Sequence, residues 1–390
     1  MLGTPQRNLV AFAMLFFAAC SAVDAQSETA KPMRFKLDDY GWQSLPKPQP
    51  GERPGSHGPL VAIDHKGRIL VGFAAHENAG LATREHPGLS FHILRFSPGG
   101  KVDRALLVPT KQYYGNGLYL GPKDQIFAHA NDTFQMPSEQ NGDGTSSAEW
   151  RSLIPCPVTC AITQSPSRQT LIIRESKDGL GNVTVWATNE STYTIIDTSS
   201  ELPLLRTCTK MAFYGEKITD KFAYWPDYDR DDDRTVRFPF CGVDNYQELP
   251  LTHVGAFFPL SDDAFLLLGS DKDRRGVVKL VGQDGHIRFQ HTMSEKNEVP
   301  QYYVGFWATS DERGDRFAFT VDTWRGGSRF FDISGKLFAR RIVVYDEKGR
   351  ELASVPVSTA YHRDFDFSLS PDGHRLAILD EGVVTVVDMQ

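Results

Sequence analysis

The stretch GPLVAIDHKGRILVGF, residues 58–73, contains the pattern that decides the fold. An apolar run at residues 60–63 is followed by a polar turn at residues 64–67 and by a second apolar run at residues 68–73. Short polar segments that include glycine supply the backbone angles of a tight reversal. The stretch therefore predicts two short antiparallel β-strands joined by a turn.

This pattern recurs along the chain. An apolar run, a polar turn of about four residues and a second apolar run occur together seven times, 44 to 60 residues apart. The turns lie near Asp64, Gly121, Ser165, Tyr214, Ser261, Ser310 and Ser370. Repeats of this length that are filled with short strands are typical of β-propellers. The sequence therefore predicts an all-β chain, a seven-bladed β-propeller with four antiparallel strands in each blade.

The two ends of the chain are expected to close the propeller. Residues 365–387 supply only three strands for the last blade, whereas residues 33–37 form a strand that belongs to no other repeat. Pairing residues 33–37 with residues 383–387 would complete blade seven and hide two strand edges. Residues 130–150 are polar and define blade two poorly, so eight blades is the alternative count.

Two of the repeats resemble those of a known group of propellers. Residues 58–73 with 91–108 carry a Gly-apolar-Asp-x-x-Gly-x-apolar stretch, and residues 370–373 have the sequence Ser-Pro-Asp-Gly. These features resemble the repeats of NHL, YVTN and WD40-like propellers of secreted bacterial proteins. The resemblance implies the fold and leaves function open, because such folds serve as enzymes, binders and scaffolds. The Trp-Asp dipeptide of WD40 blades is missing, and residues 224–227, Tyr-Trp-Pro-Asp, differ from a YWTD motif at one position.

The N-terminus has the features of an export signal. Arg7 precedes an apolar run at residues 9–19, and Ala25 is a small residue suited to signal-peptidase cleavage. We therefore expect a signal peptide at residues 1–25, a linker at residues 26–32 and a single propeller domain at residues 33–390, in the periplasm or outside the cell. The alternative is a lipoprotein that is acylated at Cys20. Neither the run at residues 9–19 nor any later segment is apolar and long enough for a transmembrane helix.

The net charge and the cysteines limit which partners and which cysteine sites the protein can have. The net charge of −7 and the lack of a basic block argue against binding of nucleic acid. The cysteines that would remain after cleavage are Cys156, Cys160, Cys208 and Cys241. An even number in an oxidising compartment predicts up to two disulfides, with the pairing open, and buried free thiols are the alternative. A zinc site is disfavoured because no second closely spaced pair of cysteines follows the first.

Candidate binding residues lie in loops on one face of the propeller. The loop before each first strand and the loop between the second and third strands share that face, where ligands usually bind. The longest such loops, at residues 74–90 and 322–340, carry the candidates His76, Arg84, His86, Trp324, Arg325 and Arg329. Aromatic rings and guanidinium groups suit a sugar, a peptide or an anion. The alternative is that the two loops only pack against each other.

A second set of candidates precedes the first strands and should surround the channel mouth. Its members are His57, Asn116, Thr207, His253, Tyr303, His362 and Arg363. The histidines belong to different blades, so we expect no metal centre and no cofactor. Asp229, Asp231 and Asp233 form a weak calcium candidate, because hard cations bind several carboxylate oxygens. That segment lacks the glycine of calcium loops, so a solvated acidic turn is the alternative.

The sequence lacks the catalytic motifs that would identify an enzyme. It contains no Gly-x-Ser-x-Gly elbow and no His-Glu-x-x-His motif. We therefore expect an exported, monomeric recognition module that binds a ligand or a protein partner on its loop-rich face. One alternative is a propeller hydrolase or lyase that acts on a polysaccharide, a lactone or a peptide. The other is a structural protein of the cell envelope.

Overall fold

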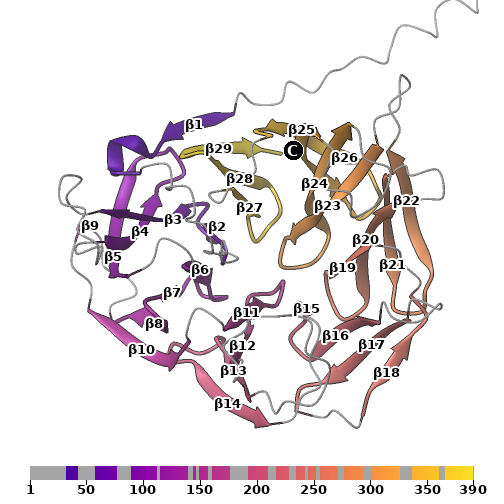
Figure 1. The fold of residues 1–390 in the computed structure, drawn as a ribbon, viewed down its shortest axis with the longest axis horizontal. Helices are drawn as coiled ribbons and strands as arrows, with labels where there is room; N and C mark the ends of the chain where they lie inside the picture. Colours follow the sequence, from indigo (N-terminus) through magenta and orange to yellow (C-terminus); the bar gives the residue numbers. More distant parts are fainter. Residues whose placement is uncertain are drawn as a thin grey trace, which may run out of the picture.

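The structure is a computed structural model of the full chain. It describes residues 32–42, 58–76, 89–111, 115–138, 144–145, 149–156, 160–175, 192–209, 217–227, 234–241, 245–251, 255–270, 276–293, 301–325, 336–359 and 365–389. Within these residues the strands form seven antiparallel sheets around a central channel (Figure 1). The predicted seven-bladed propeller is therefore confirmed.

Each blade has four antiparallel strands; in blades one to six they follow chain order from the channel to the periphery, whereas β1 is the outermost strand of blade seven (Figure 1). Blade one has β2 (Val61–Ile63), β3 (Ile69–His76), β4 (Leu89–Phe96) and β5 (Val102–Pro109). Blade two has β6 (Gly117–Leu120), β7 (Ile126–Ala130), β8 (Thr133–Pro137) and β10 (Trp150–Pro155). Blade three has β11 (Ala161–Gln164), β12 (Thr170–Glu175), β13 (Thr192–Asp197) and β14 (Leu204–Thr209).

The remaining blades follow the same order. Blade four has β15 (Lys217–Ile218), β16 (Phe222–Asp227), β17 (Arg234–Pro239) and β18 (Gln247–Leu249). Blade five has β19 (Gly255–Pro259), β20 (Ala264–Ser270), β21 (Gly276–Gly282) and β22 (Ile287–Met293). Blade six has β23 (Gln301–Ser310), β24 (Arg316–Arg325), β25 (Lys336–Asp346) and β26 (Glu351–Val357). Blade seven has β27 (Asp366–Leu369), β28 (Arg375–Asp380), β29 (Val383–Asp388) and β1 (Met33–Lys36).

The N-terminal strand completes the last blade, as predicted. β1 pairs antiparallel with β29, so that Met33 lies opposite Val386 and Lys36 opposite Val383. The chain then passes through Leu37, whose backbone N–H donates to the carbonyl of Gly382 (2.8 Å), into the short 3-10 helix η1 (Asp38–Tyr40). Leu37 is 0% exposed and belongs to the apolar cluster between blades seven and one. This closure gives the edge of β29 its hydrogen-bonding partner.

Three details differ from the predicted pattern. Strand β9 (Gly144–Thr145), in the segment between β8 and β10, pairs in parallel with β5 and adds a fifth strand to the sheet of blade one. The fourth repeat turns at residues 219–221 instead of near Tyr214, because its first strand, β15, has only two residues. The two long loops are shorter than predicted, since β3 continues to His76 and β24 continues to Arg325.

The longer strands of blade six depend on a buried ion pair. Arg340 of β25 lies opposite Asp322 of β24, and its Nε and Nη2 groups donate to the two carboxylate oxygens at 2.8 Å each. Polar residues in this stretch predicted a loop. Because the two charges satisfy each other within the sheet, the strands continue through them.

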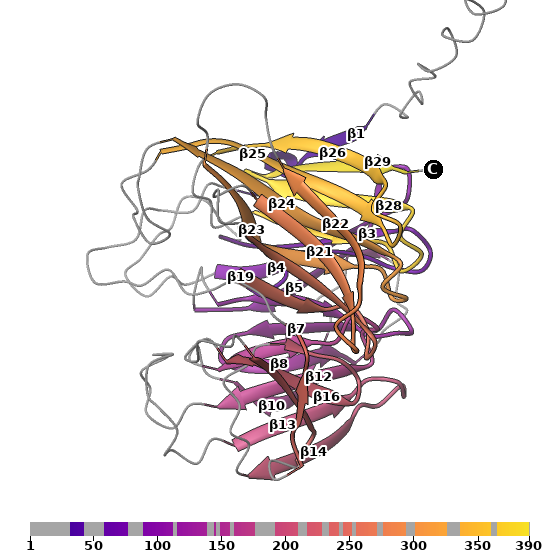
Figure 2. The same cartoon turned by 90° about the vertical axis from the view of Figure 1, so that its right-hand side faces the viewer.

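The turns between first and second strands link neighbouring blades on one face, which we call the turn face. The strands run between this face and the opposite one, which we call the open face (Figure 2). Hydrogen bonds on the turn face join His65 to Asp124, Gln125 to the carbonyl of Thr198, Ser167 to Asp220, Thr219 to Asp262, Arg316 to the carbonyl of Gly373, and Arg375 to the carbonyl of Gly67. These contacts hold neighbouring blades together on the turn face.

Closure by the N-terminal strand predicts a large effect of truncating Leu37. Leu37→Ala should lower the free energy of unfolding by about 2–5 kcal/mol, the usual cost of removing a buried leucine side chain. The exposed neighbour Lys36, on the same strand, provides the control, and Lys36→Ala should change stability by less than about 0.5 kcal/mol. Urea denaturation of both variants measures the difference. Equal midpoints for Leu37→Ala and the wild type would contradict the closure.

Candidate functional site

The central channel contains a cavity of about 450 Å³, a size that suits a small organic ligand. Its walls come from the first strand of every blade. The lining residues include Ala62, Leu118, Thr163, Ile218, Phe258, Thr309 and Ser368. Within the described residues each first strand is the edge strand of its sheet, so its backbone groups also border this space. The cavity therefore combines apolar side chains, hydroxyl groups and backbone polar groups.

Arg168 closes the cavity at the turn face. This residue lies in the turn between β11 and β12 of blade three and has a left-handed φ of 63°. Its Nη1 donates to the carbonyl of Ile63 in blade one (2.8 Å), and its Nη2 donates to the carbonyl of Leu369 in blade seven (3.4 Å). Burial lowers the pKa of Arg168, and the charges of Glu312, Asp124 and Asp64 oppose this effect. One guanidinium group thus connects three blades across the end of the channel.

His65 completes the charged group around Arg168. Its Nδ1 lies 2.8 Å from Asp124 Oδ1, its Nε2 lies 3.2 Å from Glu312 Oε2, and Arg168 Nε lies 4.0 Å from Glu312 Oε1. Burial lowers the pKa of His65, but the hydrogen bond to Asp124 and the charge of Glu312 outweigh burial, so the pKa is raised. Four blades contribute to this cluster, which therefore joins them at the turn face.

Asp366 is the acidic group at the other end of the cavity. It begins β27, and its Oδ2 accepts the backbone N–H groups of Leu60 (2.5 Å) and Val61 (2.9 Å) from blade one. Burial raises the pKa of this carboxyl to about 6, against the opposing effect of these hydrogen bonds. The nearby Tyr119 hydroxyl also has a raised pKa, first because of burial and then because of the charge of Asp366. The cavity therefore holds a carboxyl group that changes charge near neutral pH.

Two aromatic residues directly precede lining residues of the cavity in blades six and seven. Trp307, 50% exposed, precedes the lining residue Ala308, and Phe365 precedes Asp366. The guanidinium of Arg340 lies beside both rings, 5.7 Å from the centroid of Trp307 and 5.5 Å from that of Phe365. An irregularity in the pairing of β23 with β24, between Val304 and Ala308, places extra residues here. Such irregularities can direct a side chain outward.

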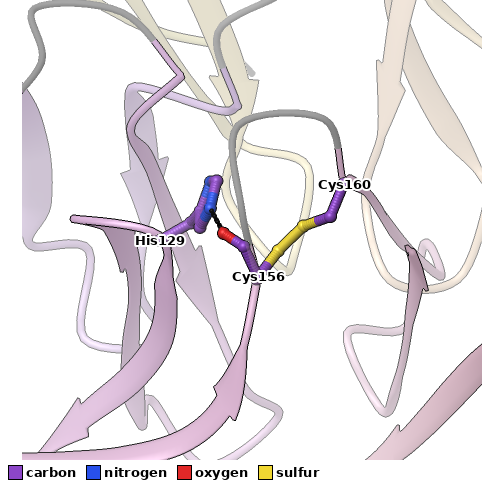
Figure 3. A group of neighbouring side chains, drawn as sticks. All are labelled: His129, Cys156 and Cys160. Carbon is purple, nitrogen blue, oxygen red and sulfur yellow. Dashed lines mark hydrogen bonds between the residues drawn. A yellow bond between two sulfur atoms is a disulfide. The ribbon is translucent and has the colours of Figure 1, made fainter. Parts of the chain in front are cut away.

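A histidine and two cysteines lie at the cavity wall between blades two and three. His129 belongs to β7, Cys156 follows β10 and Cys160 precedes β11 (Figure 3). Cys156 and Cys160 form a pair at disulfide distance, with 5.5 Å between their Cα atoms, and Cys208 and Cys241 form the other pair, with 5.4 Å. All four predicted cysteines are thus paired, which selects one of the three pairings left open by the sequence.

The structure places few of the predicted binding residues in the cavity. Asn116 is buried, accepts a hydrogen bond from the Thr110 hydroxyl (3.2 Å) and is not part of the lining. Thr207 lies on β14, the outermost strand of blade three, so its predicted position before a first strand was wrong.

Other predicted residues lie on strands or outside the described residues. The backbones of His76, Tyr303, Trp324 and Arg325 belong to strands β3, β23 and β24, and their side chains are not described. The predicted residues outside the described part of the chain are His57, Arg84, His86, Asp229, Asp231, Asp233, His253, Arg329, His362 and Arg363. These residues remain sequence-based predictions.

Arg168 and Asp366 are the channel groups that the sequence analysis missed. A signal for Arg168 was present, because the corresponding turns of blades one, six and seven have Gly67, Gly314 and Gly373 with positive φ. An arginine where other repeats have glycine indicates that contacts of its side chain offset the cost of the positive φ. Asp366 gave no such signal, since its partners are backbone groups far away in the sequence.

Comparisons with known proteins leave the function open. No family model matches the chain, and no curated protein matches it in sequence. The β-propeller domain of the trilobed protease from Pyrococcus furiosus is 13% identical, with a TM-score of 0.47, over 85% of this chain and 94% of that domain. The WD40 domain of Toxoplasma gondii coronin is 10% identical, with a TM-score of 0.42, over 93% of this chain and 87% of that domain.

An oligogalacturonate lyase in complex with manganese is also similar, with 10% identity and a TM-score of 0.46, over 85% of this chain and 96% of the lyase. Likenesses this distant carry no argument about what the chain binds, and the blade count follows from its own strand pairing. Among the described residues, no helix has the length and apolar character needed to cross a membrane.

The raised pKa of Asp366 predicts a pH-dependent difference between the wild type and Asp366→Asn. The carboxamide oxygen can still accept the N–H groups of Leu60 and Val61. In the wild type, the contribution of Asp366 to the free energy of unfolding falls as the pH rises from 3.8 to about 6, because the ionised carboxylate is less favourable in the fold than in the unfolded chain. Asp366→Asn has no ionisable group at this position, so the difference between its free energy of unfolding and that of the wild type should rise from pH 3.8 to about pH 6.

Urea denaturation at a series of pH values measures this difference. Asp311, whose pKa burial also raises to about 6, contributes equally to both proteins and cancels. Parallel pH profiles for the two proteins would contradict the assigned environment of Asp366.

The position of Arg168 predicts a loss of stability when its side chain is shortened. Arg168→Asn keeps a residue type that tolerates positive φ, but it removes the donors to the carbonyls of Ile63 and Leu369. Leaving buried acceptors without donors costs about 1–3 kcal/mol, and urea denaturation should show a loss of this size. Arg313, exposed in the corresponding turn of blade six, is the matched control, and Arg313→Ala should have little effect. Equal losses for both variants would contradict the bridging role of Arg168.

Proposed function

We propose that this chain is an exported recognition module that binds a small ligand in its central cavity. The observation that carries the proposal is the cavity of about 450 Å³, which Arg168 closes at the turn face. A ligand would therefore enter from the open face, where the first strands begin. The volume lies within the usual range for small-molecule sites, about 300–1,000 Å³.

The chemistry of the walls favours a saccharide of one or two rings. The lining includes apolar residues together with the hydroxyl-bearing residues Thr163, Thr309, Ser310 and Ser368. Sugars present hydroxyl groups at their edges and C–H groups on their faces, so they match such a mixture. The exposed ring of Trp307 offers an apolar surface next to the cavity, and Asp366 offers a carboxylate acceptor.

The export part of the proposal rests on the N-terminal sequence and the cysteine pairs. Residues 1–25 have the charge and hydropathy pattern of a signal peptide, with acylation at Cys20 as the alternative. Two cysteine pairs at disulfide distance are typical of proteins in an oxidising compartment. The propeller, residues 33–390, would then act in the periplasm or outside the cell.

One observation favours a second candidate, a hydrolase or lyase that uses the same cavity. A carboxyl group with a pKa of about 6 is suited to general acid or base catalysis near neutral pH, and Asp366 is such a group. Turnover of a saccharide by the wild type, and its loss in Asp366→Asn, would favour the enzyme over the recognition module.

Filling the cavity should abolish ligand capture without unfolding the chain. Thr309 lines the cavity, and the bulky side chain of Thr309→Trp would occupy space that a ligand needs. A glycan array probed with wild-type protein should give positive spots that Thr309→Trp loses by at least about tenfold in apparent affinity, a free-energy difference of about 1.4 kcal/mol.

The matched control adds the same side chain outside the channel. Gln290, exposed on the outermost strand of blade five, allows the variant Gln290→Trp, which should keep wild-type binding. Thermal unfolding of both variants checks the fold. Retained saccharide binding by folded Thr309→Trp, or an array without positive spots, would contradict the proposed cavity site.

A further inference from the structure

We propose that His129, Cys156 and Cys160 form a zinc site in the reduced protein, with an open coordination position that faces the central cavity. One candidate ligand atom from each residue lies within 4.8 Å of the others (Figure 3). The three residues come from two blades, so the fold rather than the local sequence brings them together. The inference is independent of the saccharide proposal.

The spacing and distances fit zinc. Three residues separate Cys156 from Cys160, within the separation of two to four residues that is typical of cysteine pairs in zinc sites. Zn–S bonds of about 2.3 Å and Zn–N bonds of about 2.0 Å place tetrahedral ligand atoms roughly 3.5–4 Å apart. To reach this geometry, the imidazole must move slightly toward the sulfur atoms, and the two sulfur atoms must move apart.

The donor set and its protonation also suit the ion. Thiolates and imidazole favour zinc over hard cations such as calcium and magnesium. Binding of a metal ion by histidine uses the neutral form of the imidazole. The Nε2 of His129 now donates to the carbonyl of Cys156 (2.8 Å), a contact that holds the ring beside the cysteine pair.

The pair of cysteines gives the site two states. In the structure Cys156 and Cys160 are joined, and no thiolate is present to bind metal. A dithiol reductant supplies two electrons and two protons, breaks the S–S bond and becomes a cyclic disulfide itself. Binding of Zn²⁺ to the two thiols then releases two protons as the two Zn–S bonds form. An oxidising disulfide reverses the sequence by taking two electrons from the thiolates, which re-form their S–S bond and release the ion.

The location of the cluster gives the site its open position. His129 and Cys160 both line the cavity, so the fourth coordination position of a tetrahedral ion would face that space. Zinc sites with three protein ligands keep the fourth position for water or a ligand. Within the described residues, no third metal-binding side chain accompanies the other cysteine pair, Cys208 and Cys241.

The test is a cobalt titration of the full chain in two redox states. After reduction with a phosphine and removal of metals, one Co²⁺ per chain should bind with a thiolate-to-cobalt charge-transfer band and tetrahedral visible bands. Zn²⁺ should displace the cobalt and raise the melting temperature of the reduced protein. The oxidised protein should show none of these bands. A reduced chain that shows no thiolate band, whether it stays folded or unfolds, would overturn the proposal.

Three variants assign the ligands. Cys156→Ser should abolish the charge-transfer band. His129→Gln should weaken cobalt binding by at least about tenfold, because loss of a mere partner of a ligand already weakens metal binding by about that factor. Cys208→Ser is the matched control, since it also removes one cysteine pair, and it should leave the titration unchanged. Circular dichroism of the oxidised His129→Gln protein checks the fold. Unchanged affinity in folded His129→Gln, or a band that depends on Cys208, would refute the assigned ligands.

Discussion

The pairing of β1 with β29 is the interaction on which the rest of the structure depends. Each blade has apolar side chains on both faces of its sheet and buries them only against its two neighbours, as the clusters between adjacent sheets show. A ring of such sheets has no end, whereas an open row would leave two apolar faces in water. By joining residues from both termini in one sheet, the chain fixes blade seven and gives it a complete surface for packing against blade one.

The closed ring makes its two faces chemically different. On the turn face, short turns bring charged and hydroxyl side chains close to neighbouring blades. The cluster of His65, Asp124, Arg168 and Glu312 is formed by such contacts. On the open face, the channel wall has Asp366 and the nearby ring of Trp307. One end is thus devoted to holding the blades together, and the other retains polar and aromatic groups that a ligand can use.

The sequence predicted the features that depend on local residue patterns and on the need of every edge strand for a pairing partner. Alternation and turn chemistry were sufficient for the seven blades, and the missing strand of the last blade was sufficient for the closure. The fourth turn was misplaced because β15 is too short to leave a periodic signal. The strand extension through Asp322 and Arg340 was missed because charged residues predict a loop unless their partner across the sheet is known.

The candidate site was harder to predict because its geometry joins distant residues. Asp366 acts on backbone groups of residues 60 and 61, and Arg168 acts on carbonyls in two other blades, contacts without any sequence motif. The histidine beside the first cysteine pair likewise comes from a different strand. Only the cysteines themselves, with their close spacing, marked that part of the wall in advance.

The β1–β29 pairing also sets the order of events when the chain folds. Its partners lie about 350 residues apart, so the first strand to be synthesised must wait for the last. Contacts this distant in sequence carry a large entropic cost of loop closure and tend to form slowly. Until the final strand exists, the ring cannot be sealed, and the nascent chain stays in an open, unfinished form. Synthesis of β29, rather than of any earlier blade, is then the event that permits the ring to close.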